Sequence, residues 1–299
     1  MFLIILLYAV LASTFVAAKY AVTCAAPAFL IGLRMVLAGC GLIAYQYWRR
    51  PSSLRIPRRD WVMFVKTALF HIYLAFTLEF WALQYVSALK TTMIYATTPF
   101  IAAFLAYVLH KDRLSRAKKL GILVGVAGLV PVFMTAAESS VHVGSLWLVG
   151  LPELVLLAAT ASAAYAWFLV KELMHKGYSL VTINGIAMLL GGLGSLLTSL
   201  CTHGFTAPVS DWHQLLLWMG LLILSANIIV YNLYGWLLRH YSITFLTFAG
   251  FLCPSFGAVY EWALTGKAMS WHYALSLLLV ITGLYIFYRQ ELAKEDAIN

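Results

Sequence analysis

Long apolar runs constrain this chain more than any other feature of its sequence. Each run is about 20 residues long, carries few charges and is followed by a short polar break, and 63% of the 299 residues are hydrophobic. A helix of roughly 20 residues spans the hydrocarbon core of a bilayer, whereas barrel strands would give alternating segments of about ten residues. Because a segment in hydrocarbon must satisfy its own backbone hydrogen bonds, these runs are predicted to be transmembrane helices.

Ten such runs are predicted, which makes the expected fold an all-α integral membrane protein. Polar residues, proline and glycine mark the breaks between them. The predicted spans are residues 2–22, 27–47, 61–85, 89–109, 118–136, 147–170, 179–201, 213–237, 241–264 and 270–288. Because ten is even, both termini lie on the same side of the membrane.

The basic residues of the loops predict which side that is. Most of the 20 Lys and Arg residues fall in loops on the side of the termini, and only Lys90 and Lys267 fall in loops on the other side. Cytoplasmic loops carry the excess of Lys and Arg, so both termini are predicted to be cytoplasmic, in the cell (inner) membrane. The net charge of +9 is then a topology signal, and nucleic acid is excluded as a partner.

Two segments of the chain are related by a constant offset of 155 residues. Residues 97–133 and 253–288 each contain an apolar helix, a short polar break and a second apolar helix, and Pro99 falls on Pro254. These segments hold the fourth and fifth spans and the ninth and tenth spans. The repeat unit is therefore predicted to contain five helices.

An odd number of helices per repeat fixes the symmetry. Two copies of a five-helix unit enter the membrane in opposite directions, which gives inverted repeats, an architecture of secondary transporters. The predicted boundaries are 1–138 for the first repeat, 146–289 for the second and 290–299 for a short cytoplasmic tail. Ten transmembrane helices in two inverted five-helix repeats are thus the expected fold.

Several motifs in these helices resemble the drug/metabolite transporter superfamily, specifically its EamA-type ten-helix members. They are Pro99, the Lys-Asp-Arg-Leu-Ser turn at 111–115, the glycines Gly121, Gly125 and Gly128, the stretch 82–88, and Lys19, Pro27 and Arg34. The sequence departs from the family pattern at Asp112, where Glu is usual, and at Lys267, the matching position in the second copy. The superfamily includes exporters of amino acids and metabolites, carriers of nucleotide sugars and transporters of S-adenosylmethionine.

Ionisable residues within the spans mark the candidate site. An ionised side chain at the centre of a membrane helix costs about 2.5–3.5 kcal/mol on insertion scales, so each one needs a partner or a wet cavity. These residues are Lys19, Arg34, Glu79, Glu153, Glu261 and His71. The five charged groups are expected in the outer third of the membrane, as an electrostatic vestibule. Snorkelling and structural ion pairing remain alternative roles, and His71 is either a proton carrier or a packing residue.

Polar side chains at helical spacing complete the predicted site. Tyr95 shares a face of its span with two threonines, and Asn227 shares a face with Tyr231 and Tyr234. Glu79 is expected to bind an ammonium or other cationic group, and Arg34 or Lys19 a carboxylate. The predicted substrate-binding residues are Glu79, Arg34, Lys19, Tyr95, Asn227, Tyr231 and Glu261, and the predicted gating residues are Pro99 and Pro254.

The predicted function is secondary active transport of a small polar amino-acid-type metabolite by alternating access, as an exporter, importer or exchanger. An amino acid, or S-adenosylmethionine and S-adenosylhomocysteine, would suit carboxylates beside aromatic rings. A nucleotide, nucleotide-sugar or lipid-linked carrier of the same fold is the alternative. Protons or a counter-substrate are the candidate driving partners, and no cofactor or metal is expected. An enzyme is disfavoured because the sequence shows no nucleophile–base set, and a lipid-handling protein remains a rival.

Overall fold

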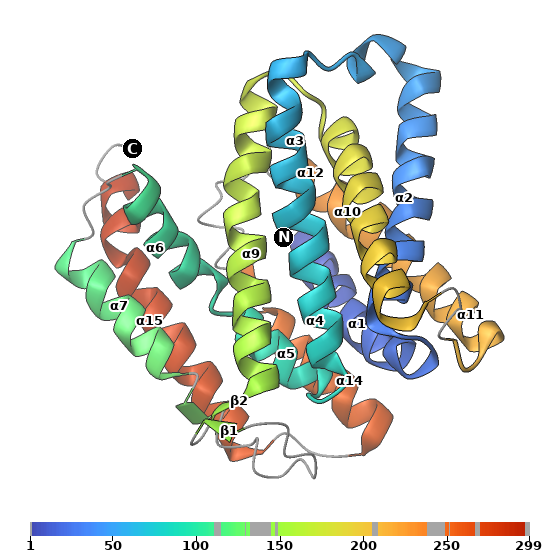
Figure 1. The fold of residues 1–299 in the computed structure, drawn as a ribbon. Coiled ribbons are helices and arrows are strands. Elements are labelled where there is room, and N and C mark those ends of the chain that lie inside the picture. The colour runs from blue at the N-terminus through green and yellow to red at the C-terminus, as the bar shows by residue number, and fades with distance from the viewer. Residues whose placement is uncertain are drawn as a thin grey trace. The chain divides into compact units, whose positions relative to one another are not determined.

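The computed structural model describes residues 2–110, 115–128, 130–131, 145–146, 149–204, 209–237, 249–250, 252–266 and 270–296. The predicted turn residue Asp112, its counterpart Lys267 and the predicted repeat boundary at 138 lie outside these ranges. The helices form two compact units, and each unit takes helices from both halves of the chain (Figure 1). Unit 1 comprises Met1–Val16, Tyr85–Leu157 and Leu237–Asn299, and unit 2 comprises Ala17–Gln84 and Ala158–Trp236.

Unit 2 is built from long helices, two of which are divided into successive segments. Its elements are α2 (Pro27–Arg49), η1 (Pro51–Leu54), η2 (Arg58–Asp60), α3 (Trp61–Thr67), η3 (Ala68–Leu74), α4 (Ala75–Leu83), α10 (Leu180–His203), α11 (Trp212–Leu222), η5 (Ile223–Val230) and α12 (Tyr231–Leu237). The segments α3, η3 and α4 follow one another without a break, as do α11, η5 and α12. Both η3 and η5 are π-helical.

Unit 1 contains helices that range from 8 residues in α5 to 26 residues in α15, and a short pair of strands. Its elements are α5 (Ala88–Tyr95), α6 (Thr98–His110), α7 (Arg116–Ala127), β1 (Ser145–Leu146), β2 (Val149–Gly150), α14 (Leu252–Thr265) and α15 (Trp271–Asp296). β1 and β2 pair in antiparallel register. Two further helices, α1 (Phe2–Cys24) and α9 (Leu151–His175), are divided between the units, and the last residue of α12, Leu237, belongs to unit 1.

Seven helices in the described ranges are long and apolar enough to cross a membrane. They are Phe2–Cys24, Pro27–Arg49, Arg58–Leu83, Ala88–Leu105, Leu151–His175, Leu180–His203 and Trp212–Leu237. Each coincides with a predicted span apart from shifts at its ends. The predicted class, an all-α multi-pass membrane protein, is confirmed.

The offset of 155 residues recurs in the helix boundaries. α7 begins at Arg116 and α15 at Trp271, while η3 begins at Ala68 and η5 at Ile223. A π-helical turn interrupts the regular hydrogen-bond ladder of a helix and often occurs at functional sites. Because η3 and η5 occupy equivalent positions in the two halves, the π-helical segment belongs to the repeat unit.

Equivalent helices of the two repeats pack against each other within unit 2. α2 and α10 lie side by side (Figure 1). Gly32 of α2 lies against Leu196 of α10, and Gly39 lies against Leu189, so one helix runs antiparallel to the other. Antiparallel packing of equivalent helices is what an inverted repeat requires.

The same relation holds for α7 and α15 within unit 1. Gly283 of α15 approaches the backbone of Gly125, and Gly128, which directly follows α7, lies against Val280, so these helices are also antiparallel. A Cβ built on Gly283 would lie 2.5 Å from the Gly125 backbone nitrogen. Such a contact is a steric clash, so only glycine, which has no Cβ, fits at this position. These small residues therefore allow close contact between the two helices.

Gly39→Ala is expected to lower the thermal unfolding temperature of the purified protein. The new Cβ would lie 2.6 Å from the Leu189 backbone nitrogen, so α2 and α10 would have to separate. Overpacking of this kind costs about 1–3 kcal/mol. Gly41→Ala is the matched control in the same helix, because nothing lies within 4 Å of a Cβ at that position. Equal losses in the two variants would contradict this account of the interface.

The fourth predicted span is confirmed as an apolar helical segment, but it is not one continuous helix. Residues 89–109 are divided into α5 and α6, with Ala96 and Thr97 between them. Pro99 has no backbone N–H to give to the carbonyl of Tyr95, and the Thr98 hydroxyl donates to that carbonyl instead. Apolar content continues through the break, so hydropathy does not register it. The proposed gating role of Pro99 stays a prediction.

Candidate functional site

Arg34 is the centre of a buried polar cluster in unit 2. Arg34 is 1% exposed, and its Nε donates a 2.9 Å hydrogen bond to the Asn227 Oδ1. The guanidinium carbon lies 5.4 Å from the Phe76 ring centre and 5.7 Å from that of Phe80. Aromatic faces attract a cation most strongly when water is excluded, so these rings stabilise the buried charge.

Glu79 and Tyr231 complete this cluster. Both interact electrostatically with the Arg34 guanidinium, and Glu79 is 6% exposed. Glu79 comes from α4, Tyr231 opens α12, and Asn227 belongs to the π-helical η5. Arg34, Glu79, Asn227 and Tyr231 are called the Arg34 cluster below. Sequence reasoning named all four, and unit 2 brings them together from three separate helical stretches.

One donor of the Arg34 cluster is left open. Arg34 Nη2 is buried and has no hydrogen-bond partner among the residues that the structure describes. A buried donor without a partner costs about 1–3 kcal/mol, and more when it is charged. Native proteins keep such a group where it serves a function, and a ligand that supplies the missing acceptor is one such function. The arrangement thus presents a guanidinium donor and a nearby carboxylate, two opposite charges fit to hold a zwitterion.

Aromatic rings extend from the Arg34 cluster. His71 of η3 contacts Tyr231 and Trp167 edge to face, with ring centres 5.7 Å and 5.2 Å apart. Trp167 in turn contacts Tyr234 with ring centres 5.0 Å apart. Neither ring nitrogen of His71 is hydrogen-bonded to any described residue. His71, Trp167, Tyr231 and Tyr234 are called the aromatic group below.

Trp167 was not predicted as a site residue. The chain has ten Trp residues, and nothing in the sequence separates Trp167 from those that face lipid or pack between helices. The sequence does indicate the other side of this contact, because Asn227, Tyr231 and Tyr234 share one polar face of their helix. Only the fold shows that α9 brings Trp167 to that face.

Lys19 binds the end of a helix. Its Nζ donates to the carbonyl of Leu83 at 2.5 Å and to that of Gln84 at 3.3 Å. These carbonyls end α4, where intrahelical donors run out and the helix dipole favours a positive charge. This contact gives Lys19 a structural role, and its predicted contact with a substrate carboxylate stays a prediction.

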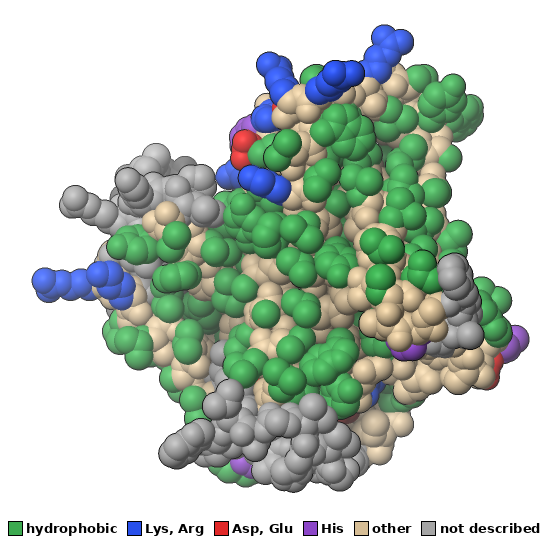
Figure 2. Space-filling model, viewed as in Figure 1, with side chains coloured by type: hydrophobic (Ala, Val, Ile, Leu, Met, Phe, Trp, Pro, Cys, Tyr) green, Lys and Arg blue, Asp and Glu red, His purple; other side chains and the backbone are tan. Residues whose placement is uncertain are grey.

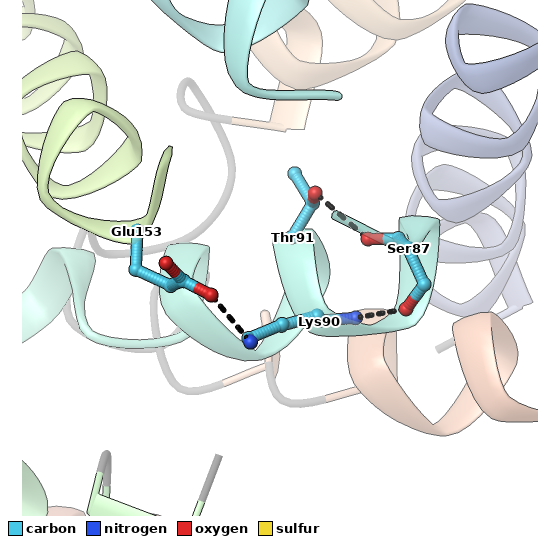
Figure 3. Close-up of polar contacts among 4 residues, drawn as sticks. All are labelled: Ser87, Lys90, Thr91 and Glu153. Atoms are coloured by element: carbon cyan, nitrogen blue, oxygen red, sulfur yellow. Dashed lines mark hydrogen bonds and ion pairs between the residues drawn. The ribbon is translucent and has the colours of Figure 1, made fainter. Parts of the chain in front are cut away.

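Lys90 and Glu153 form a buried ion pair in unit 1 (Figure 3). Lys90 Nζ lies 2.5 Å from Glu153 Oε1, and both side chains are 4% exposed. The expectation that Lys90 lies in a loop is wrong. The Ser87 hydroxyl caps α5 by accepting a hydrogen bond from the Lys90 N–H, and the Ser87 carbonyl accepts one from the Thr91 hydroxyl. The helix therefore begins at Ala88, and Lys90 lies in its first turn.

The remaining predicted residues also lie in unit 1. Glu261 Oε2 accepts a 3.1 Å hydrogen bond from the Leu89 N–H, in the first turn of α5, where a carboxylate is favourable. Tyr95 ends α5 and packs on Phe15, with ring centres 5.2 Å apart. Pro254 lies in the first turn of α14, a position where proline is tolerated. Their predicted roles in binding and gating stay predictions.

Comparison with known proteins gives a family match along nearly the whole chain. The profile of the EamA-like transporter family matches twice, over residues 1–134 and 150–289. Two matches in one chain imply two repeats, in agreement with the antiparallel packing of equivalent helices. A solved crystal structure of a protein has the same fold, with a TM-score of 0.63, 20% sequence identity, and coverage of 98% of this chain and 96% of that one.

Curated relatives are similar over almost the same length. An S-adenosylmethionine/S-adenosylhomocysteine transporter of Chlamydia trachomatis serovar L2 is 35% identical over 97% of this chain and 89% of its own length. A transporter of the same description from Chlamydia muridarum is 34% identical over 97% of this chain and 92% of its own. A chloroplastic WAT1-related protein of Arabidopsis thaliana is 25% identical over 91% of this chain and 65% of its own.

Proposed function

Because the chain belongs to the EamA-like transporter family, we propose that it is a secondary transporter of S-adenosylmethionine and S-adenosylhomocysteine. It would lie in the inner membrane with both termini in the cytoplasm, as the distribution of Lys and Arg predicts. The observation that carries the proposal is the Arg34 cluster, a buried guanidinium with an open donor beside a buried carboxylate.

The amino-acid end of these substrates matches the Arg34 cluster in charge. Their carboxylate would accept a charge-assisted hydrogen bond from Arg34 Nη2. Their ammonium would pair with Glu79, while Asn227 holds the guanidinium in place through Nε. Both substrates share this end, so one arrangement serves the methylated and the demethylated compound. Similar affinity for the two is what an exchanger requires.

The nucleoside end of these substrates matches the aromatic group. Adenine offers a flat π-face for stacking, and the sulfonium of S-adenosylmethionine is a cation that aromatic faces attract. His71, Trp167 and Tyr234 extend from Tyr231, which also belongs to the Arg34 cluster. A nucleotide or nucleotide sugar would instead bring phosphates next to Glu79. Like-charge repulsion by Glu79 therefore disfavours that alternative.

Competition for bound S-adenosylmethionine tests this proposal on the purified full-length protein. Labelled S-adenosylmethionine would be displaced by unlabelled S-adenosylmethionine and S-adenosylhomocysteine at similar concentrations. Methionine and adenosine, each carrying one end of the substrate, should compete only at much higher concentrations, because each keeps half of the contacts. Stronger displacement by a nucleotide sugar than by S-adenosylhomocysteine would instead support the alternative carrier.

A further inference from the structure

A second site is suggested by a cavity at one end of unit 2. It encloses about 800 Å³ and is lined by residues of the 52–60 segment and by residues 176–178. The first segment lies in the connection from α2 to α3, which contains η1 and η2, and the second joins α9 to α10. None of the Arg34 cluster lines it.

The cavity has an excess of positive charge. Arg55, Arg59 and Lys176 line it, against one carboxylate, Asp60. That carboxylate is already engaged, since Lys176 Nζ lies 2.9 Å from Oδ1 and the Tyr178 hydroxyl donates a 2.6 Å hydrogen bond to Oδ2. Partial burial and this bond raise the pKa of the Tyr178 hydroxyl to about 12, so it remains a donor at physiological pH.

Two guanidinium groups are therefore left for a ligand. Arg55 and Arg59 are exposed, and neither forms an ion pair within 4 Å in the described part of the chain. Figure 2 shows Lys and Arg side chains gathered at the end of unit 2 where α2 and α3 are joined, next to a broad hydrophobic flank. The planar donor fork of Arg matches the oxygens of a phosphate, and the Ser52 hydroxyl at the cavity wall adds a neutral donor.

The level of the cavity relative to the membrane surface favours a lipid as the source of that phosphate. Trp48 and Trp61 flank the segment that builds it, and both are exposed. Exposed Trp residues at the ends of membrane helices lie at the level of the lipid headgroups. Basic pockets at that level on the cytoplasmic side bind phosphate-bearing headgroups of anionic lipids. A free phosphate group has the same chemistry but would need no such depth.

We propose that this cavity binds the phosphate of an anionic lipid headgroup, held chiefly by Arg55 and Arg59. The site is separate from the proposed substrate site and does not depend on which metabolite is carried. Occupation would fix the connection between α2 and α3 to the membrane surface.

Lipid retention on the purified full-length protein tests the proposal. The protein is reconstituted in phosphatidylcholine nanodiscs containing a small share of phosphatidylglycerol, and the phosphatidylglycerol that remains bound after extraction is counted by native mass spectrometry. R55Q/R59Q is expected to lower the affinity roughly tenfold or more, since each basic residue near a membrane surface contributes several-fold. R50Q/R58Q is the matched control, because it removes two exposed arginines of the same connection that do not line the cavity.

Three results would overturn the proposed phosphate site or the assignment of the phosphate to a lipid. Unchanged retention in R55Q/R59Q would exclude the cavity as a phosphate site. Equal losses in both double variants would reduce the effect to general surface charge. Displacement of phosphatidylglycerol by millimolar inorganic phosphate would assign the cavity to free phosphate instead of lipid. Because Arg55 and Arg59 are exposed, neither substitution removes core packing.

Discussion

Glu79→Gln is expected to lower the rate of S-adenosylmethionine uptake roughly 100-fold. The substitution keeps the size of the side chain but removes the charge that would pair with the substrate ammonium, and it leaves the buried Arg34 without its neighbouring carboxylate. Removing one partner of a buried charge pair typically costs about 2–5 kcal/mol, and two orders of magnitude correspond to about 2.7 kcal/mol. Uptake into vesicles at matched protein levels measures the change.

Two controls separate this effect from unfolding and from net charge. Glu172→Gln makes the same chemical change at an exposed position of α9 and should leave uptake unchanged. The thermal unfolding temperature of Glu79→Gln, measured in detergent, shows whether the protein still folds. Undiminished uptake by a folded Glu79→Gln variant would remove Glu79 from the substrate site.

Lys90→Met is expected to destabilise the protein by about 3–5 kcal/mol. The substitution leaves the Glu153 carboxylate buried in unit 1 without its 2.5 Å partner, and an uncompensated buried charge is strongly destabilising. Thermal unfolding in detergent measures the loss. Lys66→Met is the matched control, because Lys66 is exposed on α3.

The double variant K90M/E153Q identifies the cause of that loss. With both charges removed, no unpaired ion remains buried, so most of the stability should return. If the double variant unfolds at the same temperature as Lys90→Met, the loss arises from packing by the lysine side chain and not from the orphaned carboxylate. The Lys90–Glu153 pair would then have no special role.

Local sequence features predicted the elements of the fold well. Apolar runs about as long as a bilayer is thick located the helices because membrane helices must satisfy their own backbone. The 155-residue offset predicted the inverted repeat, which appears as antiparallel packing of α2 on α10 and of α7 on α15. The cost of burying charge singled out Arg34 and Glu79, which the fold brings together.

The same local features do not predict which distant side chains pair, or where a helix departs from regular α-helical geometry. Lys90 looked like a loop residue because it stands at the start of an apolar run, and only the fold brings its side chain to Glu153 in the first turn of α9. The break before Pro99 depends on threonine hydroxyls competing for backbone carbonyls, which hydropathy does not record. The π-helical η3 and η5, which carry His71 and Asn227, leave no mark on apolar periodicity.

Counterflow in proteoliposomes that contain only this protein tests the central claim most directly. Liposomes are loaded with unlabelled S-adenosylhomocysteine, and labelled S-adenosylmethionine is added outside. The account predicts accumulation of label well above that in protein-free liposomes, with Glu79→Gln close to the protein-free background. Folded wild-type protein that accumulates no label above protein-free liposomes would contradict the assignment of both the substrate and the Arg34 cluster.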